Sequence, residues 1–177
     1  AEAAGVAAED IIASDLYLYN RTPASVWGAE NEFISAPRLD DLQCVFGCLQ
    51  GFLAADAGES VPVLAVFNNE EVGSGTRQGA DSTFLSDVLR RINSALERTE
   101  EDYLTAVANS FLVSADNAHA VHPAHPEYSD PNEAPVMNGG IVIKYNASQR
   151  YTTDAVSAAV FRQICEEVDV PVQTYSN

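Results

Sequence analysis

The sequence predicts an α/β fold with a largely parallel central sheet. Strand-like apolar runs alternate along the chain with apolar residues at helical spacing, an order typical of parallel-sheet proteins. In addition, residues 62–67 (PVLAVF) form a continuous apolar run, as in a central strand that is covered on both faces. We therefore expect the functional residues to gather beyond the carboxyl ends of the strands.

The first half of the chain contains four further expected elements. Residues 15–20 alternate between apolar and polar and predict a strand, and residues 33–36 predict a shorter one. Apolar residues then recur at helical spacing from 39 to 53, and the pattern stops near Gly58. A helix over 84–96 follows a glycine-rich loop, and its expected cap is Asp81 or Ser82.

The second half repeats the alternation. A short helix is expected over 102–109, and residues 122–138 hold four prolines and predict a long loop. The remaining elements are three strands, over 111–114, 140–145 and 171–175, and a helix over 156–168.

Composition excludes several classes of function. The chain has 177 residues, 26 Asp and Glu against 9 Lys and Arg, and a formal net charge of −17. Because a protein with this negative charge is repelled by phosphate backbones, we expect no nucleic acid as a partner. No apolar run is long enough to span a membrane, and no signal peptide is visible at the start. The length suits one domain with a hydrophobic core.

The cysteines favour a reducing compartment. Cys44, Cys48 and Cys165 are an odd number, and the first two lie within an apolar helical pattern. We interpret all three as buried thiols of a cytoplasmic protein.

Three acidic clusters occupy the ends of expected strands or the starts of expected helices: Asp40–Asp41, Glu70–Glu71 and Asp116. A single carboxylate at such a place is usually a helix cap or a solvated loop residue. Three clusters at one sheet edge would repel one another, and a divalent metal would neutralise them in a chain with so few basic residues. Carboxylates around two metals, with a general base, are suited to hydrolysis.

Two other motifs carry less weight. The loop over 73–79 has glycines spaced G-x-G-x-x-x-G, and Glu70 and Glu71 would place anions where a nucleotide phosphate binds. His122 and His125 alternate with prolines and are interpreted as loop residues. His119, three residues after Asp116, is retained as a site residue.

Four runs, in this order, carry a family resemblance: 33–42 (FISAPRLDDL), 67–76 (FNNEEVGSGT), 114–123 (SADNAHAVHP) and 143–151, with Ile143-Lys144 and Gln149-Arg-Tyr151. They resemble the aspartyl aminopeptidase family. The resemblance implies a three-layer α/β/α zinc-peptidase-like sandwich, incomplete in this chain. It further implies a cytosolic dinuclear-metal exopeptidase that removes N-terminal Asp or Glu and assembles into a homo-oligomer, a tetrahedral dodecamer.

The same resemblance implies a role for each matching residue. Asp40 would bridge two divalent metals, most often Zn²⁺ with Co²⁺ or Mn²⁺ as alternatives, and would be followed by a cis peptide bond. Glu70 would be the general base that deprotonates the attacking water. Glu71 and Asp116 would each bind one metal, and His119 and Lys144 would contact the substrate.

The chain also departs from the family pattern. It lacks the His-x-Asp motif and the late histidine that supply imidazole ligands, so we expect a central fragment with little or no activity alone. Residues 1–24 would be the tail of the inserted dimerisation domain, and residues 25–177 the central part of the catalytic domain. Two alternatives stay open: an aminopeptidase for neutral residues, and a non-catalytic acidic domain that binds a structural divalent cation or a partner subunit.

Overall fold

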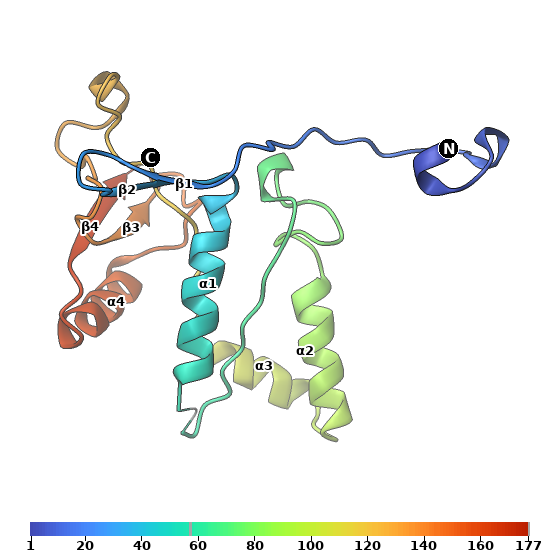
Figure 1. Ribbon diagram of the computed structural model, residues 1–177. Coiled ribbons are helices and arrows are strands. Elements are labelled where there is room, and N and C mark those ends of the chain that lie inside the picture. Colours follow the sequence, from blue (N-terminus) through green and yellow to red (C-terminus); the bar gives the residue numbers. More distant parts are fainter. Residues whose placement is uncertain (57, 177) are drawn as a thin grey trace. The chain divides into compact units, whose positions relative to one another are not determined.

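The computed structural model describes residues 1–56 and 58–176 and contains both helices and strands (Figure 1). The chain divides into two compact units, Ala1–Gln43 and Cys44–Asn177. The expected α/β class is confirmed, with a short parallel sheet in the second unit.

The first unit is built around a β-hairpin. Strands β1 (Ser25–Trp27) and β2 (Phe33–Ser35) pair antiparallel, with Trp27 opposite Phe33. The two rings stack with centroids 4.8 Å apart, and the Trp27 Nε1–H donates to Ser35 Oγ at 2.8 Å. Two single-turn 3₁₀ helices precede the hairpin, η1 (Glu2–Ala4) and η2 (Ala8–Asp10).

Helix α1 (Leu39–Ala54) starts in the first unit and continues into the second. The second unit then forms a pair of contacting helices, α2 (Phe84–Ala95) and α3 (Glu100–Ala108). The Arg90 guanidinium lies 4.8 Å from the centre of the buried Tyr103 ring and bonds Glu100 at 3.2 Å. For α2, the Phe84 N–H donates to Ser82 Oγ at 3.2 Å, although the residue at the N-cap itself is Thr83.

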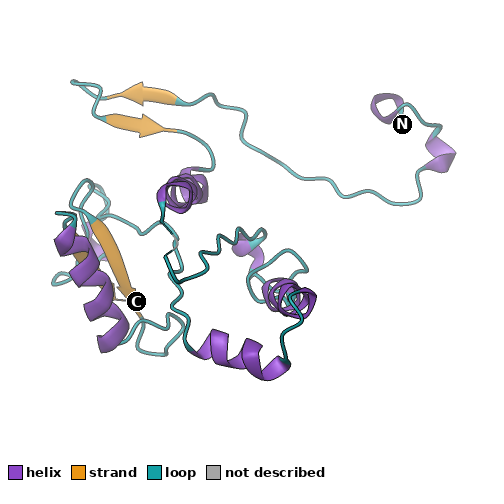
Figure 2. Ribbon diagram, turned by 90° about the horizontal axis from the view of Figure 1, so that it is seen from below, coloured by secondary structure: helices purple, strands orange, loops and turns teal. Residues whose placement is uncertain are grey.

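The parallel sheet is a β–α–β unit. Strands β3 (Ile141–Tyr145) and β4 (Val172–Ser176) pair in parallel, with Ile143 opposite Thr174, and α4 (Ala155–Glu167) connects them. Parallel neighbours need such a crossover, and Figure 2 shows α4 beside the strands. A capping box between Asp154 and Ser157 starts α4, and its backbone and side-chain hydrogen bonds hold the pKa of the Asp154 carboxyl below its usual range.

The loop over 122–138 is present as expected and contains one 3₁₀ turn, η4 (Pro126–Tyr128). Its base is closed because the Val121 N–H donates to the Pro135 carbonyl at 2.9 Å. Gln173 on β4 adds two bonds to this base, accepting from the Val136 N–H at 2.8 Å and donating to the Val136 carbonyl at 3.1 Å.

Three expected strands are wrong. Residues 15–20, 62–67 and 111–114 are irregular in the structure. A strand requires neighbouring backbone groups to pair with, and within the described residues the ladders join only β1 to β2 and β3 to β4. The apolar side chains of these runs stay accessible, including Leu18, Val63 and Leu112.

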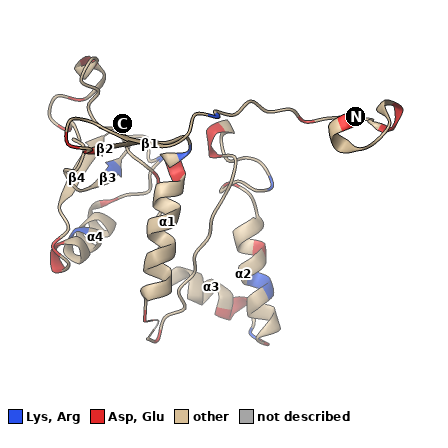
Figure 3. Ribbon diagram, in the orientation of Figure 1, with Lys and Arg blue, Asp and Glu red and all other residues tan. Residues whose placement is uncertain are grey.

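The hydrophobic core is much smaller than the length suggested. Among the described residues, the buried hydrophobic side chains are Tyr103, Ile143, Ala158 and Cys165. Cys44 and Cys48 are thiols of intermediate exposure and Cys165 is buried, so the expected burial holds for Cys165 and not for the other two. Among the charged residues, acidic ones outnumber basic ones, and Figure 3 shows where they lie along the ribbon. Within the described part of the chain, no helix is long and apolar enough to cross a membrane.

Candidate functional site

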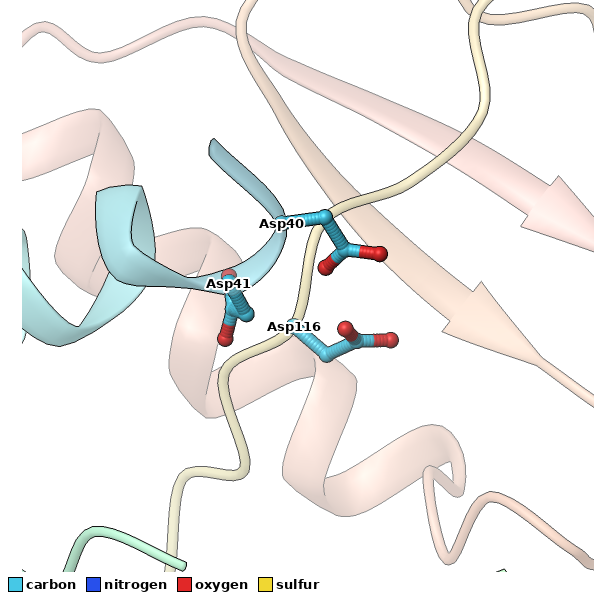
Figure 4. Close-up of side chains that lie close together, drawn as sticks. All are labelled: Asp40, Asp41 and Asp116. Carbon is cyan, nitrogen blue, oxygen red and sulfur yellow. The ribbon is translucent and has the colours of Figure 1, made fainter. Parts of the chain in front are cut away.

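The first carboxylate pair lies where α1 begins. Asp40 and Asp41 are joined by a cis peptide bond, as the resemblance implied, and neither has helical dihedrals. Figure 4 shows both side chains leaving the first turn of the helix. Asp41 Oδ1 is buried and has no hydrogen-bond partner among the described residues. A buried oxygen of this kind is costly unless a donor or a cation satisfies it.

The second pair, Glu70 and Glu71, occupies the 3₁₀ turn η3 (Glu70–Val72). Left-handed residues flank the turn, Asn69 at φ 60° and Gly73 at φ 95°. Two bonds secure the ends: the Gly73 N–H donates to the Glu70 carbonyl at 2.8 Å, and Asn69 Nδ2–H donates to Thr76 Oγ1 at 2.9 Å. Both glutamate side chains are exposed.

The loop that carries these glutamates closes on itself. The Asn68 N–H donates to the Gln78 carbonyl at 2.8 Å, and the Asp81 N–H donates to the Ser74 carbonyl at 3.2 Å. Gly79 is buried beneath it, and a Cβ at this position would lie 1.9 Å from the Ser74 carbonyl oxygen. Gly79 therefore serves the close backbone packing of this loop, and no phosphate need be invoked for it.

Asp116 and Lys144 form a direct ion pair. Lys144 Nζ donates to Asp116 Oδ2 at 2.5 Å, and the two side chains are 15% and 45% exposed. Lys144 belongs to the ladder of β3, whereas Asp116 lies in an irregular segment (Figure 4). Two residues that the sequence suggested for separate roles, metal binding and substrate binding, are thus in contact.

Two further groups surround the Lys144 ammonium. It donates to the Asn117 carbonyl at 2.7 Å, and it lies 5.8 Å from the centre of the Tyr151 ring. The Asn117 side chain also accepts a hydrogen bond from the Cys44 thiol, with Cys44 Sγ 3.4 Å from Asn117 Oδ1. Sequence reasoning assigned no role to Asn117 or Tyr151, although both lie inside the motifs that carried the resemblance.

The three histidines differ in their surroundings. His119 is exposed in the irregular segment that follows Asp116. The ring centroids of His122 and His125 lie 5.4 Å apart, with the rings tilted. The His125 ring stacks on that of Tyr128, with centroids 5.2 Å apart. His125 Nδ1 bonds Glu127 at 3.0 Å, which holds the pKa of that carboxyl below its usual range. This agrees with the interpretation of His122 and His125 as loop residues.

The donor chemistry of the carboxylates fits divalent cations. Asp40, Glu71 and Asp116 offer exposed oxygen ligands, which bind Mg²⁺, Ca²⁺ and Mn²⁺ and also contribute to Zn²⁺ sites. The Asp41 oxygen that lacks a hydrogen-bond partner is an additional acceptor beside Asp40. Zn²⁺ sites usually include an imidazole or a thiolate as well.

Comparison with known proteins identifies the family. Residues 1–177 match the family described as Aminopeptidase I zinc metalloprotease (M18). The chain belongs to the M18 family of zinc aminopeptidases. A probable M18 family aminopeptidase 2 from Clostridium novyi is 47% identical over 169 residues, covering 96% of this chain and 39% of that protein.

Solved structures of M18 aminopeptidases share the fold. A crystal structure of yeast aminopeptidase 1 superposes with a TM-score of 0.76 at 32% identity, over 89% of this chain and 38% of that one. The mApe1 dodecamer of S. cerevisiae gives a TM-score of 0.75 at 32% identity, over 89% and 37% of the two chains. The chain spans about two fifths of the length of the curated relatives it matches.

Proposed function

We propose that this chain is part of the catalytic domain of an M18 metalloaminopeptidase that releases N-terminal Asp or Glu from peptides. The observation that carries the proposal is the η3 turn, in which Glu70 and Glu71 are adjacent, exposed and fixed by a loop with its own hydrogen bonds. Neighbouring carboxylates in a rigid turn can divide two tasks, one binding a metal and the other moving a proton. Membership in a family of zinc metalloproteases supports this reading.

Each residue has a role in the proposal. Asp40, Glu71 and Asp116 would be the ligands of the two divalent metals. When bound, these ions would supply the Lewis acidity that activates water and polarises the scissile carbonyl. Glu70 accepts the proton of the attacking water and returns a proton to the leaving amine. His119 contacts the substrate, and the Lys144 ammonium pairs with its acidic side chain.

The assignment of the rest of the chain is part of the same proposal. Residues 1–24 form the tail of an inserted dimerisation domain, and residues 25–177 form the central part of the catalytic domain. A homo-oligomer in the cytoplasm is proposed for the whole protein, and a similar solved structure is a dodecamer. By itself, the 177-residue segment should have little or no peptidase activity, because its sequence does not contain the two histidine motifs in which the family resemblance places imidazole ligands.

The substitution Glu70→Gln in the full-length protein tests the mechanism. We expect turnover of an aspartyl anilide to fall by about 10²–10⁴-fold, the usual contribution of a general base, while the metal content measured by mass spectrometry stays the same. Glu59→Gln, which removes an exposed loop carboxylate, is the matched control and should leave turnover unchanged. Equal activity of both variants would favour the non-catalytic acidic domain.

Substrate preference is tested separately with the wild-type protein. Hydrolysis of aspartyl and glutamyl anilides should exceed that of leucyl and alanyl anilides in kcat/KM. The reverse order would retain the aminopeptidase and replace the acidic preference by a neutral one.

A further inference from the structure

The contacts of Lys144 join an irregular segment to the parallel sheet. Residues 109–122 contain no helix or strand, so backbone ladders do not hold Asp116 in place. Lys144, in contrast, lies opposite Tyr175 in the β3–β4 ladder. Its ammonium binds Asp116 Oδ2 at 2.5 Å and the next residue's carbonyl, Asn117 O, at 2.7 Å.

We propose that Lys144 is the positioning residue for Asp116, fixing its carboxylate for metal binding. The proposal rests on the function proposed above, in which Asp116 is a metal ligand. Because Lys144 contacts Oδ2 of Asp116, a metal cation could bind Oδ1 of the same carboxylate without breaking that contact. Removing a group that orients a ligand in this way typically lowers metal affinity by about 10–100-fold.

The surroundings of the ammonium suit this purpose. Lys144 is only 15% exposed, so its contact with Asp116 is less screened by water than a surface ion pair would be. The two hydrogen bonds account for two of the three N–H donors of an ammonium. The third donor leaves Lys144 able to pair with a substrate carboxylate, so both proposed roles are compatible.

Replacing Lys144 could change the metal affinity in either direction, depending on the role of the ammonium. A cation near a metal repels it, so removing the charge of Lys144 without any loss of order should strengthen metal binding. If Lys144 positions Asp116, its removal should instead weaken binding, because the carboxylate loses its fixed orientation. These two consequences are opposite and can be distinguished by one measurement.

The experiment is calorimetric titration of Mn²⁺ and of Zn²⁺ into the metal-free, full-length protein. We expect Lys144→Met to weaken binding by about tenfold, at the lower end of the range for groups that orient metal ligands. Lys144→Arg, which keeps the charge and the donors, should restore most of the affinity. Arg150→Met is the control for loss of one positive charge from an exposed residue, the one that precedes Tyr151 in the sequence, and should bind like wild type.

Unchanged or tighter binding by Lys144→Met would overturn the proposal. If that variant lacks the wild-type circular dichroism spectrum, Lys144→Leu decides, because it also removes both the charge and the N–H donors and must also bind more weakly. Weaker binding in a protein that cleaves no acidic substrate would sustain this inference and reject the proposed specificity. Unaltered metal binding by Lys144→Met, in a protein whose wild type cleaves acidic substrates, would reject this inference and sustain the proposed specificity.

Discussion

Thr99 illustrates how one side chain determines where a helix begins. Its Oγ1 accepts the Asp102 N–H at 3.2 Å, and the Asp102 carboxylate accepts the Thr99 N–H at 2.8 Å. This capping box starts α3 at Glu100, two residues before the start that apolar spacing suggested. The side-chain bond from Thr99, followed by the backbone bond, holds the pKa of the Asp102 carboxyl below its usual range.

Replacing Thr99 by Ala should therefore destabilise the start of α3. The expected cost of losing a threonine cap is about 1 kcal/mol, which corresponds to roughly fivefold faster amide exchange in the first turn. Hydrogen exchange followed by NMR measures this change. Thr105→Ala, within the same helix, is the matched control and should not accelerate exchange, because alanine is the better helix former.

The effect of Thr99→Ala should depend on pH. Because the folded pKa of Asp102 is lowered, its contribution to stability is present above the unfolded pKa and disappears as pH falls through the folded pKa. The difference between variant and wild type should thus be largest near neutrality and shrink below pH about 4. A difference that stays constant down to acidic pH would contradict the role of the Asp102 carboxylate.

At the scale of elements, the β3–α4–β4 unit contains most of the buried hydrophobic side chains among the described residues. Ile143 on β3 is 7% exposed, whereas Ile141 on the same strand is 43% exposed. The two isoleucines therefore provide a comparison within one strand. Ile143→Val should lower the free energy of unfolding by about 1 kcal/mol, and Ile141→Val by much less. Urea denaturation measures both values, and equal losses would mean that burial of Ile143 does not stabilise this unit.

Which elements could be predicted depended on where their partners lie. The helices α1, α2 and α4 and the strands β3 and β4 follow from local periodicity, and the two strands find each other through a short connection. The strands expected over 62–67 and 111–114 have the right composition, yet no described segment pairs with them. Periodicity also did not anticipate β1, because Ser25–Trp27 is too short for a pattern.

The candidate site was predictable in its residue types and only partly in its contacts. Carboxylates at the ends of apolar runs were enough to single out Asp40, Glu70 and Asp116 in the sequence. The cis peptide after Asp40 followed from the family resemblance and is confirmed. Spacing could not reveal the contact of Lys144 with Asp116, because the two residues are 28 positions apart and meet through tertiary structure.

At the scale of the whole molecule, exposed apolar side chains and negative charge oppose each other. Large apolar residues are accessible in both units, among them Ile12 and Leu18 in the first and Phe46 and Leu112 in the second. Such surfaces favour association. A net charge of −17 repels a second copy of the chain, over a distance that salt shortens to about 10 Å at 0.1 M.

The 177-residue chain should accordingly associate more strongly as salt increases. Sedimentation velocity at low and high ionic strength measures the effect, with the expectation of a shift from monomer towards larger species. Binding of an apolar dye should decrease in parallel as the accessible side chains become covered. A chain that stays monomeric at every salt concentration would show that these side chains do not drive association.

Lys144 is the only lysine in the sequence, and this has a practical consequence for spectroscopy. Reductive methylation with isotopically labelled formaldehyde would mark one side chain and the terminal amine, and it preserves the positive charge. The spectrum of the 177-residue chain would then contain a single side-chain methylamine signal, located beside Asp116 and Tyr151. Its chemical shift would report cation binding and peptide binding at the same atom, without a fluorophore or an engineered cysteine.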